Sequence, residues 1–387
     1  MREKRSIPVW AAVAAGGVCA ILPLGLCARG GGGAWETPTQ PAGVDLAMML
    51  DYARAWWTTG NPFAGLNPYP PLAAVLFAPL AALPFAAAYA LLTALTLAAF
   101  VSVVGILPLL AFPRADRGAT LLAALAGALS YGLAFELRWG QFNALALAGA
   151  AWGLYLFHRG GGRGARAGAY VLFSAAIQLK LYPAIFVFLF AKDARAWRAN
   201  LARWTALGAA NVALLFALGP QVFADFLLSL RAQAAAPFTW AGNHSLQSFA
   251  AWAGHPGLAP ALFAAFAACF AVAGIRAARA GGRAAFAELA LLAALGAMLV
   301  PGVSHDYKLV AFSMAFAPFV AAAEPAERGS LRGLAAAGRL AALGFLYAWT
   351  LFSYAAKPAW LQNNAPFLLA AGAVLALRPP AAARREP

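Results

Sequence analysis

Residues 85–112 read FAAAYALLTALTLAAFVSVVGILPLLAF and contain no charged side chain. A helix that crosses a bilayer perpendicularly needs about 20 mainly apolar residues, so this run is long enough to span a membrane. Apolar runs recur along the rest of the chain. We therefore expect an all-α integral membrane protein.

The composition excludes the common alternatives. Hydrophobic residues make up 63% of the 387 residues, charged residues make up 11%, and the mean hydropathy is +0.72. An ordinary soluble domain has about a quarter charged residues, so a disordered chain, a coiled coil and a typical soluble enzyme are all excluded. The three cysteines show no metal-ligand spacing. We predict no disulfide framework, no metal site and no cofactor.

About twelve apolar runs are predicted to be spans of a single polytopic membrane domain over residues 1–387. Several are shorter than a perpendicular span requires, so we expect broken helices or extensions into polar flanks. The first run is long for a signal peptide and lacks small residues at the cleavage spacing, which predicts an uncleaved span. The approximate bounds are 7–28, 85–112, 119–136, 141–157, 168–179, 182–191, 204–218, 257–275, 285–300, 308–323, 334–355 and 364–377.

One further apolar segment, residues 69–84, is interrupted by four prolines. Counting it as a span would reverse the downstream topology and place the basic loops outside. We predict that it is a re-entrant or interfacial element, which is tolerated where backbone is buried in protein. The remaining spans then lie within 85–377.

The distribution of Lys and Arg predicts the orientation. Alternate threading of the spans places 21 of the 28 Lys and Arg residues on the side of both termini. Such a bias over short loops is the positive-inside rule, so both termini are expected in the cytoplasm. It accounts for most of the net charge of +15 without a nucleic-acid partner. The seven cations on the outer side are Arg29, Arg54, Arg138, Lys180, Arg231, Lys308 and Lys357.

The two longest stretches between spans, 29–68 and 219–256, both fall on the predicted outer face. Within the first, apolar residues from Leu46 to Trp57 recur at intervals of three or four, which predicts an amphipathic helix. Such a helix can lie on the membrane surface. The same pattern also fits a plain packing helix.

Polar side chains gather at the predicted outer ends of the spans. Ionisable groups near the apolar zone usually pair or line a cavity, so their recurrence on one face predicts a shared cavity. Cations there suit a lipid phosphate, and the carboxylates of Asp45 and Asp306 suit proton transfer from an attacking hydroxyl. The same groups would also suit a transporter of anionic lipid. The set comprises Glu136, Arg138, Gln141, Asn143, Gln178, Lys180, Tyr182, Asn243, His244, Gln247, His305, Asp306 and Lys308.

Short motifs follow one another in order between about residues 43 and 310. They are Asp45 with Ala-Arg-Ala at 53–55 and Gly-Asn-Pro-Phe at 60–63, Tyr-Pro-Pro-Leu at 69–72, Gly-Gln-Phe-Asn at 140–143, Lys-Leu-Tyr-Pro at 180–183, Asn-His-Ser-Leu at 243–246 and Asp-Tyr at 306–307. No single motif is specific, but the ordered set resembles glycosyltransferase family 87. That family belongs to the multi-spanning GT-C class and includes polyprenyl-phosphate-mannose-dependent mannosyltransferases.

The resemblance implies a GT-C-like helical bundle and a hexosyltransferase. The enzyme would transfer a sugar such as mannose from a polyprenyl-phosphate donor to a lipid or glycan acceptor. The reaction would take place on the outer face of the bacterial cytoplasmic membrane. In GT-C enzymes an acidic residue of the first outer loop is the general base, and Asp45 has the matching position. Together with the polar set above, this predicts contacts to the donor phosphate and substrates by Arg138, Gln141, Asn143, Lys180, Tyr182, Asn243, His244, His305, Asp306 and Lys308.

Two other functions remain open. A transporter or flippase of lipid-linked sugar would often show internal repeats with paired broken helices, and the Asp45 loop has no counterpart near 220–260. A polymerase or ligase of surface polysaccharide would share the topology and the donor. All three alternatives have the lipid bilayer as a partner, and none requires nucleic acid.

Overall fold

The structure is a computed structural model. It describes residues 6–28, 41–63, 65, 67–193, 196–235, 238–280, 282–324, 326–327 and 330–377. This part contains seventeen α-helices and one pair of two-residue strands, which confirms the nearly all-helical prediction. The predictions made for the basic start of the chain, for the first part of the 29–68 loop and for the last inner segment fall on 1–5, 29–40 and 378–387, outside the described residues.

Candidate membrane spans are fewer than the predicted twelve. Among the described residues, the helical stretches Phe85–Ala111 and Pro256–Ala277 are long and apolar enough to cross a membrane. Two bent pairs raise the number to four if each pair is one span: Arg117–Ala128 with Tyr131–Trp139 at 44°, and Trp197–Leu215 with Pro220–Ala235 at 101°. The helices thus support a membrane protein, while the number of spans stays a prediction.

Two of the apolar segments form only short helices. The segment predicted as a span at 182–191 forms a 3₁₀ helix, Tyr182–Leu189, which rises about 16 Å, half of the bilayer core. Within 69–84, the helix α3 (Pro71–Ala81) has only 11 residues, and Pro84 precedes the next helix. Neither segment is long enough to cross a bilayer by itself.

The chain divides into two compact units, and each is described by itself. Unit 1 comprises Met1–Thr37, Val104–Leu133 and Thr239–Pro387, and unit 2 comprises Pro38–Val103 and Ala134–Phe238. A π-helical segment, Ser102–Ile106, lies at one of the chain positions where the units change. The helix α7 (Tyr131–Trp139) lies at another. The single membrane domain predicted over 1–387 stays a prediction.

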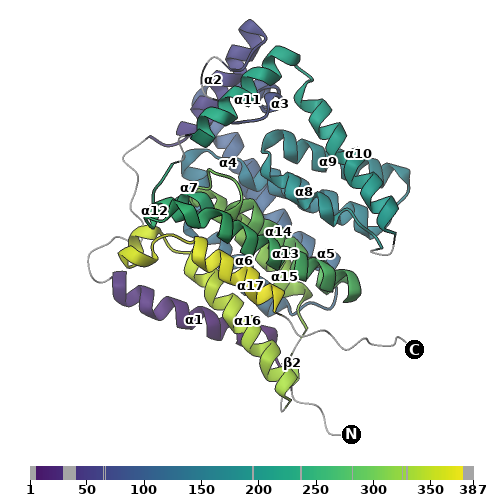
Figure 1. The fold of residues 1–387 in the computed structure, drawn as a ribbon, viewed down its shortest axis with the longest axis vertical. Coiled ribbons are helices and arrows are strands. Elements are labelled where there is room, and N and C mark those ends of the chain that lie inside the picture. Colours follow the sequence, from purple (N-terminus) through teal and green to yellow (C-terminus); the bar gives the residue numbers. More distant parts are fainter. Residues whose placement is uncertain are drawn as a thin grey trace. The chain divides into compact units, whose positions relative to one another are not determined.

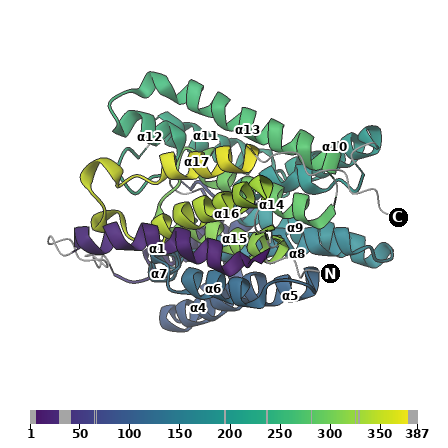
Figure 2. The same ribbon diagram turned by 90° about the horizontal axis from the view of Figure 1, so that it is seen from below.

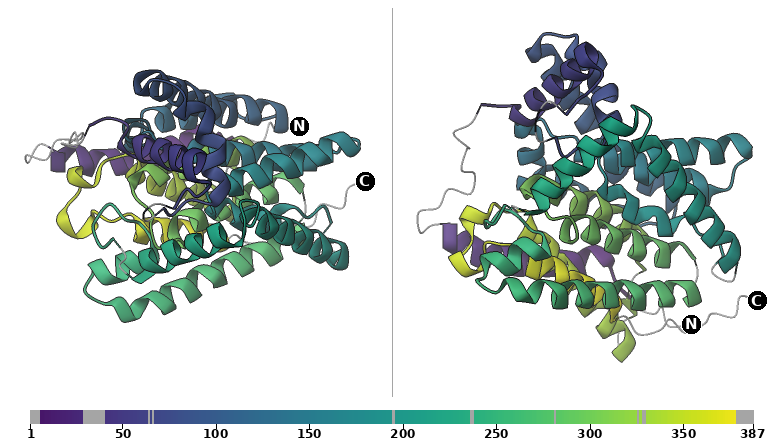
Figure 3. Two further views of the ribbon diagram at one scale, coloured as in Figure 1. Left: turned by 90° about the horizontal axis from the view of Figure 1, so that it is seen from above. Right: turned by 45° about the horizontal axis from the view of Figure 1, so that its top comes forward.

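Unit 1 is built around closely packed helices. The helices α1 (Val9–Ala28) and α16 (Leu331–Thr350) lie side by side (Figures 1 and 2). A Cβ at Gly16 would lie 1.8 Å from the carbonyl oxygen of Ala341, so only glycine permits this approach. The buried helix α15 (Val310–Ala322) packs against α6 (Arg117–Ala128) and α14 (Gly282–Leu299). The helix α13 (Ala259–Ala280) runs beside α17 (Ala365–Ala376; Figure 3, green and yellow). The other elements of unit 1 are α5 (Leu107–Ala111), α12 (Leu246–Trp252), the strands β1 (Ser6–Ile7) and β2 (Ala326–Glu327), and 3₁₀ helices at Pro256–Leu258, Asp306–Leu309, Tyr354–Ala356 and Ala359–Leu361.

Unit 2 contains the helix predicted in the first outer loop. This helix, α2 (Val44–Thr59), buries Leu46, Met49, Leu50 and Ala53 against α3 and Phe142. The predicted apolar stripe is therefore confirmed as the packing face. The other helices of unit 2 are α4 (Phe85–Val101), α8 (Asn143–Arg159), α9 (Arg163–Leu179), α10 (Trp197–Leu215) and α11 (Pro220–Ala235).

Candidate functional site

The first polar cluster lies in unit 2, where the start of α2 meets the turn after α7. Gly140 in this turn has φ +66°, and a Cβ there would lie 2.8 Å from Cβ of Leu46. Glycine is thus required both for the backbone conformation and for the close approach of the turn to α2. The approach brings Gln141 beside Asp45.

Gln141 connects a carboxylate with an ammonium group. Its Nε2 donates a hydrogen bond to Oδ2 of Asp45 at 2.5 Å, and its Oε1 accepts one from Nζ of Lys180 at 2.6 Å. Because a carboxylate only accepts and an ammonium only donates, these partners assign the orientation of the amide. We call this set the Asp45–Gln141–Lys180 bridge. Among the described residues, none donates a hydrogen bond to the other oxygen of Asp45, Oδ1.

Lys180 lies beside two aromatic rings. Its side chain follows α9, its residue is only 7% exposed, and Nζ lies 4.4 Å from the ring centre of Tyr69 and 4.3 Å from that of Phe142. Cation–π contacts of this kind stabilise an ammonium group that has lost part of its water. The site therefore holds a buried positive charge near Asp45.

Asn143 and Tyr182 make hydrogen bonds that stabilise the turn next to Gln141. Asn143 Nδ2 donates to Oε2 of the fully buried Glu136 at 2.7 Å, and the backbone N–H of Ala144 donates to Oε1 at 2.9 Å. A carboxylate at the start of α8 is also favoured by the helix dipole. Tyr182 Oη donates to the carbonyl oxygen of Asn143 at 3.4 Å. Both residues thus order the turn that carries Gln141.

Asp45 does not cap its helix. The N-cap of α2 is Gly43, and no side chain makes a capping hydrogen bond there. Burial raises the pKa of Asp45 above its usual value, while the hydrogen bond from Gln141 and the charge of Lys180 act in the opposite direction. A raised pKa makes the carboxylate a stronger base once it is ionised.

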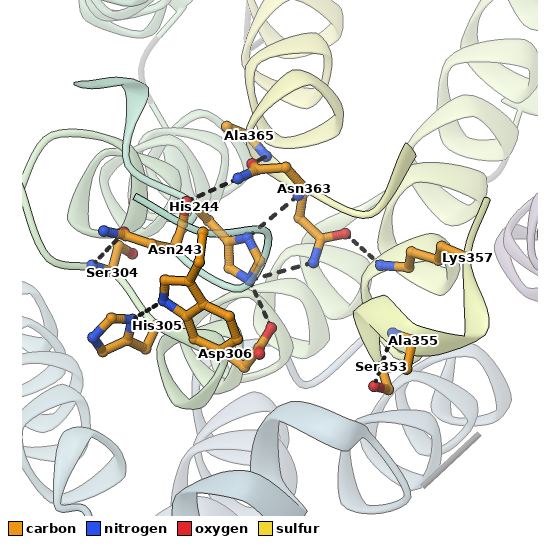
Figure 4. Close-up of polar contacts among 12 residues, drawn as sticks. Asn243, His244, Ser304, His305, Asp306, Ser353, Ala355, Lys357, Asn363 and Ala365 are labelled. Atoms are coloured by element: carbon orange, nitrogen blue, oxygen red, sulfur yellow. Dashed lines mark hydrogen bonds and ion pairs between the residues drawn. The ribbon is translucent and has the colours of Figure 1, made fainter. Parts of the chain in front are cut away.

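The second polar cluster lies in unit 1 around His244 (Figure 4). The imidazole Nε2 lies 2.9 Å from Oδ1 of Asp306, and both side chains are fully buried. The backbone N–H of Asn364 donates to the other ring nitrogen, Nδ1, at 3.3 Å. Because a backbone N–H can only donate, Nδ1 accepts, and this contact favours the tautomer with its proton on Nε2, which faces Asp306 at 2.9 Å and Nδ2 of Asn364 at 3.4 Å.

Asn243 joins the two loops that carry this cluster. Its Oδ1 accepts a hydrogen bond from the backbone N–H of Ser304 at 2.8 Å, and its Nδ2 donates to the carbonyl oxygen of Gly302 at 3.1 Å. An isolated antiparallel bridge pairs Asn243 with His305. These bonds hold His244 and Asp306 in register.

The neighbouring predicted residues have contacts of their own. Trp240 Nε1 donates to Nδ1 of His305 at 3.0 Å, and Nζ of Lys308 donates to the carbonyl oxygen of Val303 at 2.5 Å. A Cβ at Gly242 would lie 2.6 Å from Oδ2 of Asp306, so this position has no room for a side chain. The loop is thus closely packed around the Asp306 carboxylate.

Three residues of this cluster were missed as site residues by the sequence analysis. Lys357 Nζ donates to Oδ1 of Asn364 at 2.5 Å, and Asn363 Nδ2 donates to the carbonyl oxygen of Asn243 at 2.9 Å. Burial lowers the pKa of Lys357 to about 7, against the opposing effect of the Asp306 charge. The sequence held only weak signals for these residues. Lys357 is one of the seven cations on the predicted outer side, and Asn363 and Asn364 are adjacent amides at the start of the last apolar run.

The predicted site residues fall into two groups. Unit 2 brings together the members of the bridge with their supporting residues, and Arg138 is half-buried in the last turn of α7. The prediction of one shared cavity stays a prediction. The residues in or beside the unit 2 cluster are Asp45, Arg138, Gln141, Asn143, Lys180 and Tyr182, and those in or beside the unit 1 cluster are Asn243, His244, His305, Asp306 and Lys308.

Comparison with known proteins identifies one family. A family model described as glycosyltransferase family 87 matches residues 67–301, which is more than half of the chain. This range includes the turns that carry Gln141, Lys180 and His244, while Asp45 and Asp306 lie outside it. No curated protein and no solved structure matches the chain.

Proposed function

The chain belongs to glycosyltransferase family 87, and from this premise we propose that it transfers a sugar from a polyprenyl-phosphate donor to a lipid or glycan acceptor. The enzyme is a glycosyltransferase with membrane helices. The proposal includes mannose as the sugar, a GT-C type of mechanism and a site on the outer face of the bacterial cytoplasmic membrane. The observation that carries it is the Asp45–Gln141–Lys180 bridge.

The bridge supplies the two groups that this reaction needs. The acceptor hydroxyl oxygen attacks C1 of the sugar, the bond from C1 to the phosphate oxygen breaks, and its electron pair leaves with the phosphate. The hydroxyl proton passes to Asp45, whose negative charge also stabilises the positive charge that develops on the sugar ring. The phosphate is already a stable anion, so its departure requires little acid catalysis.

We assign the donor phosphate to the cations of the predicted set. Lys180 is favoured first because it is buried within the bridge, and a charge-assisted bond to phosphate is strong in such a site. Arg138, in the same unit, is proposed as a further phosphate contact, and Gln141, Asn143 and Tyr182 are proposed to bind substrate or to support Lys180 and Asp45. For the residues of unit 1, the roles predicted from the sequence stay proposals: a phosphate contact for Lys308, and substrate binding for Asn243, His244, His305 and Asp306.

A transfer assay tests the proposed function. Purified protein in vesicles is given radiolabelled polyprenyl-phosphate mannose, and the label is followed into membrane lipid or glycan. Transfer from this donor, with none from a nucleotide sugar, is the expected result. Movement of the intact labelled lipid between leaflets without sugar release would instead establish a transporter or flippase. Label that appears only in long polymer would favour the polymerase or ligase.

The orientation of the chain gives a separate prediction. Reporter fusions at Gly162 and at Ala235 should lie on opposite sides of the membrane, Gly162 inside and Ala235 outside, because basic residues surround the former. Two reporters measure the side on which each position lies: one that fluoresces only in the cytoplasm and one that is active only outside it. The same sidedness at both positions would contradict the predicted topology.

Gln141 is predicted to set the pH dependence of transfer. Its hydrogen bond lowers the pKa of Asp45, so Gln141→Met should raise that pKa further. A base must be ionised to act, and the fall in kcat/KM on the acid side should therefore begin at a higher pH in the variant. Rates measured across the pH range test this.

A matched control is available in the same unit. Gln221 donates to Asp225 at 3.0 Å in an exposed pair on α11, and Gln221→Met should leave the pH profile unchanged. If kcat/KM falls at the same acidic pH in Gln141→Met and in the unmodified protein, the bridge does not change the pKa of Asp45.

A further inference from the structure

Tyr69 belongs to one of the sequence motifs, but its side chain has no role in the proposed function. It begins the Tyr-Pro-Pro-Leu stretch just before α3, and it is buried. Its backbone N–H donates a hydrogen bond to Oδ1 of Asn67 at 3.0 Å. Its ring centre lies 5.1 Å from that of Phe142. The backbone and the ring of Tyr69 are thus both fixed in unit 2, beside the turn that carries Gln141.

The hydroxyl group of Tyr69 contacts the Asp45–Gln141–Lys180 bridge. Its Oη accepts a hydrogen bond from Nε2 of Gln141 at 3.4 Å, and the same Nε2 donates to Oδ2 of Asp45 at 2.5 Å. An amide nitrogen carries two hydrogens and cannot accept, so one Gln141 side chain can serve both partners. Oη is therefore the acceptor in this contact, and its own proton can be donated to another group.

The Oη proton of Tyr69 has no acceptor among the described residues. Burial raises the pKa of Tyr69 above its usual value, and the negative charge of Asp45 raises it further. The phenol therefore keeps its proton. Because a buried donor without an acceptor costs free energy, a bound ligand that supplies the acceptor would be favoured here.

The neighbours of this hydroxyl indicate the chemistry of the ligand. Nζ of Lys180 lies 4.4 Å from the ring centre of Tyr69, so a cation and a neutral donor lie close together. Phosphate oxygens carry negative charge and accept hydrogen bonds, which suits both groups at once. A sugar hydroxyl is uncharged and gains less from the cation. The site thus favours a phosphate oxygen as the missing acceptor.

We propose that Tyr69 donates a hydrogen bond from Oη to an oxygen of the donor phosphate, next to Lys180; this inference rests on the proposed function. The contact is non-covalent, and the proton stays on Oη. When the bond from C1 of the sugar to the phosphate oxygen breaks, the phosphate gains negative charge. A donor that is already fixed beside it stabilises this charge. Tyr69 therefore acts in binding of the donor and in departure of the phosphate.

Tyr69→Phe tests the contact by a binding measurement that requires no sugar transfer. Phenylalanine keeps the ring beside Lys180 and Phe142 but lacks Oη. In calorimetric titration of the purified protein in detergent, Kd of farnesyl phosphate should rise about tenfold, as expected for one lost hydrogen bond. Kd of farnesol, which has the same chain without the phosphate, should not change.

Tyr347→Phe is the matched control. This buried tyrosine of unit 1 donates from Oη to the carbonyl oxygen of Ala123 at 3.1 Å, so its variant also loses one hydrogen bond of a tyrosine hydroxyl. Both Kd values should equal those of the unmodified protein.

The pH profile of transfer gives a second readout. Tyr69→Phe should lower kcat/KM by a similar factor at every pH, and the fall on the acid side should begin at the same pH as in the unmodified protein. The reason is that Gln141 still donates to Asp45 in this variant. A shifted acid side would show that Tyr69 acts through Gln141 and Asp45, which overturns the phosphate contact.

Two binding results would also overturn the proposal. An unchanged Kd of farnesyl phosphate in Tyr69→Phe would exclude the phosphate contact, and reduced transfer in that case would place Oη at the sugar. An equal rise of Kd for farnesol would show a structural effect of the hydroxyl. The proposed function fails separately: unmodified protein that binds farnesyl phosphate through Tyr69 and transfers no sugar would refute the transferase and leave the phosphate contact in place.

Discussion

Asp45→Asn is expected to remove nearly all sugar transfer while the protein folds and inserts normally. Asparagine keeps the shape of the side chain and an oxygen that accepts the hydrogen bond from Gln141, but it has no basicity. Loss of a general base lowers a rate by about 10²–10⁴. The structural alternative of a lost helix cap is excluded by geometry, because Gly43 occupies the N-cap position. Initial rates with a polyprenyl-phosphate sugar, at equal amounts of membrane protein, measure the effect.

The same helix provides the control. Asp51 is 73% exposed on α2 and pairs with Arg54 at 2.9 Å. An exposed ion pair contributes about 0–1 kcal/mol, so Asp51→Asn should transfer sugar at the normal rate. Near-normal transfer by Asp45→Asn would move the role of the base to Asp306, and Asp306→Asn would then be the decisive variant.

Lys180→Met should have the second largest effect, a loss of donor use with little change in folding. Methionine has a similar length and can pack against the rings of Tyr69 and Phe142, but it carries no charge. A hydrogen bond to a charged group contributes about 1.5–3 kcal/mol, which corresponds to about 10- to 150-fold in kcat/KM. Gln141 Oε1 also loses the hydrogen bond that it accepts from Nζ.

Inhibition by free polyprenyl phosphate measures the phosphate contact directly. The inhibition constant should rise in Lys180→Met by a factor similar to the loss in kcat/KM. Lys192 serves as the control because it is an exposed lysine that also lies over an aromatic ring, 5.4 Å from the centre of Phe157. Lys192→Met should behave as the unmodified protein. An unchanged inhibition constant in Lys180→Met would remove this lysine from the phosphate site.

The sequence by itself determined the all-helical class, several of the helical stretches and which face of α2 is buried. The apolar spacing from Leu46 to Ala53 predicted the packing stripe that the structure contains. The predicted runs at 141–157 and 364–377 likewise correspond to α8 and α17. These features depend on the composition and periodicity of neighbouring residues, which can be read along the chain without knowledge of tertiary contacts.

The number of spans and the breaks between helices were harder to predict, because apolar composition alone does not show where a helix bends. The run at 119–136 was predicted as one span and is divided between α6 and α7 with a bend of 44°. The run at 182–191 became a 3₁₀ helix.

Only the tertiary structure decided which polar side chains meet. Gln141 lies 96 positions from Asp45, and Asn364 lies 120 positions from His244. No local pattern encodes a pairing across such distances, because the packing of helices brings these residues together. The orientation of the Gln141 amide and the tautomer of His244 follow from these long-range partners. The motif residues could be named from the sequence, whereas the bridge and the contact of Lys357 with Asn364 required the fold.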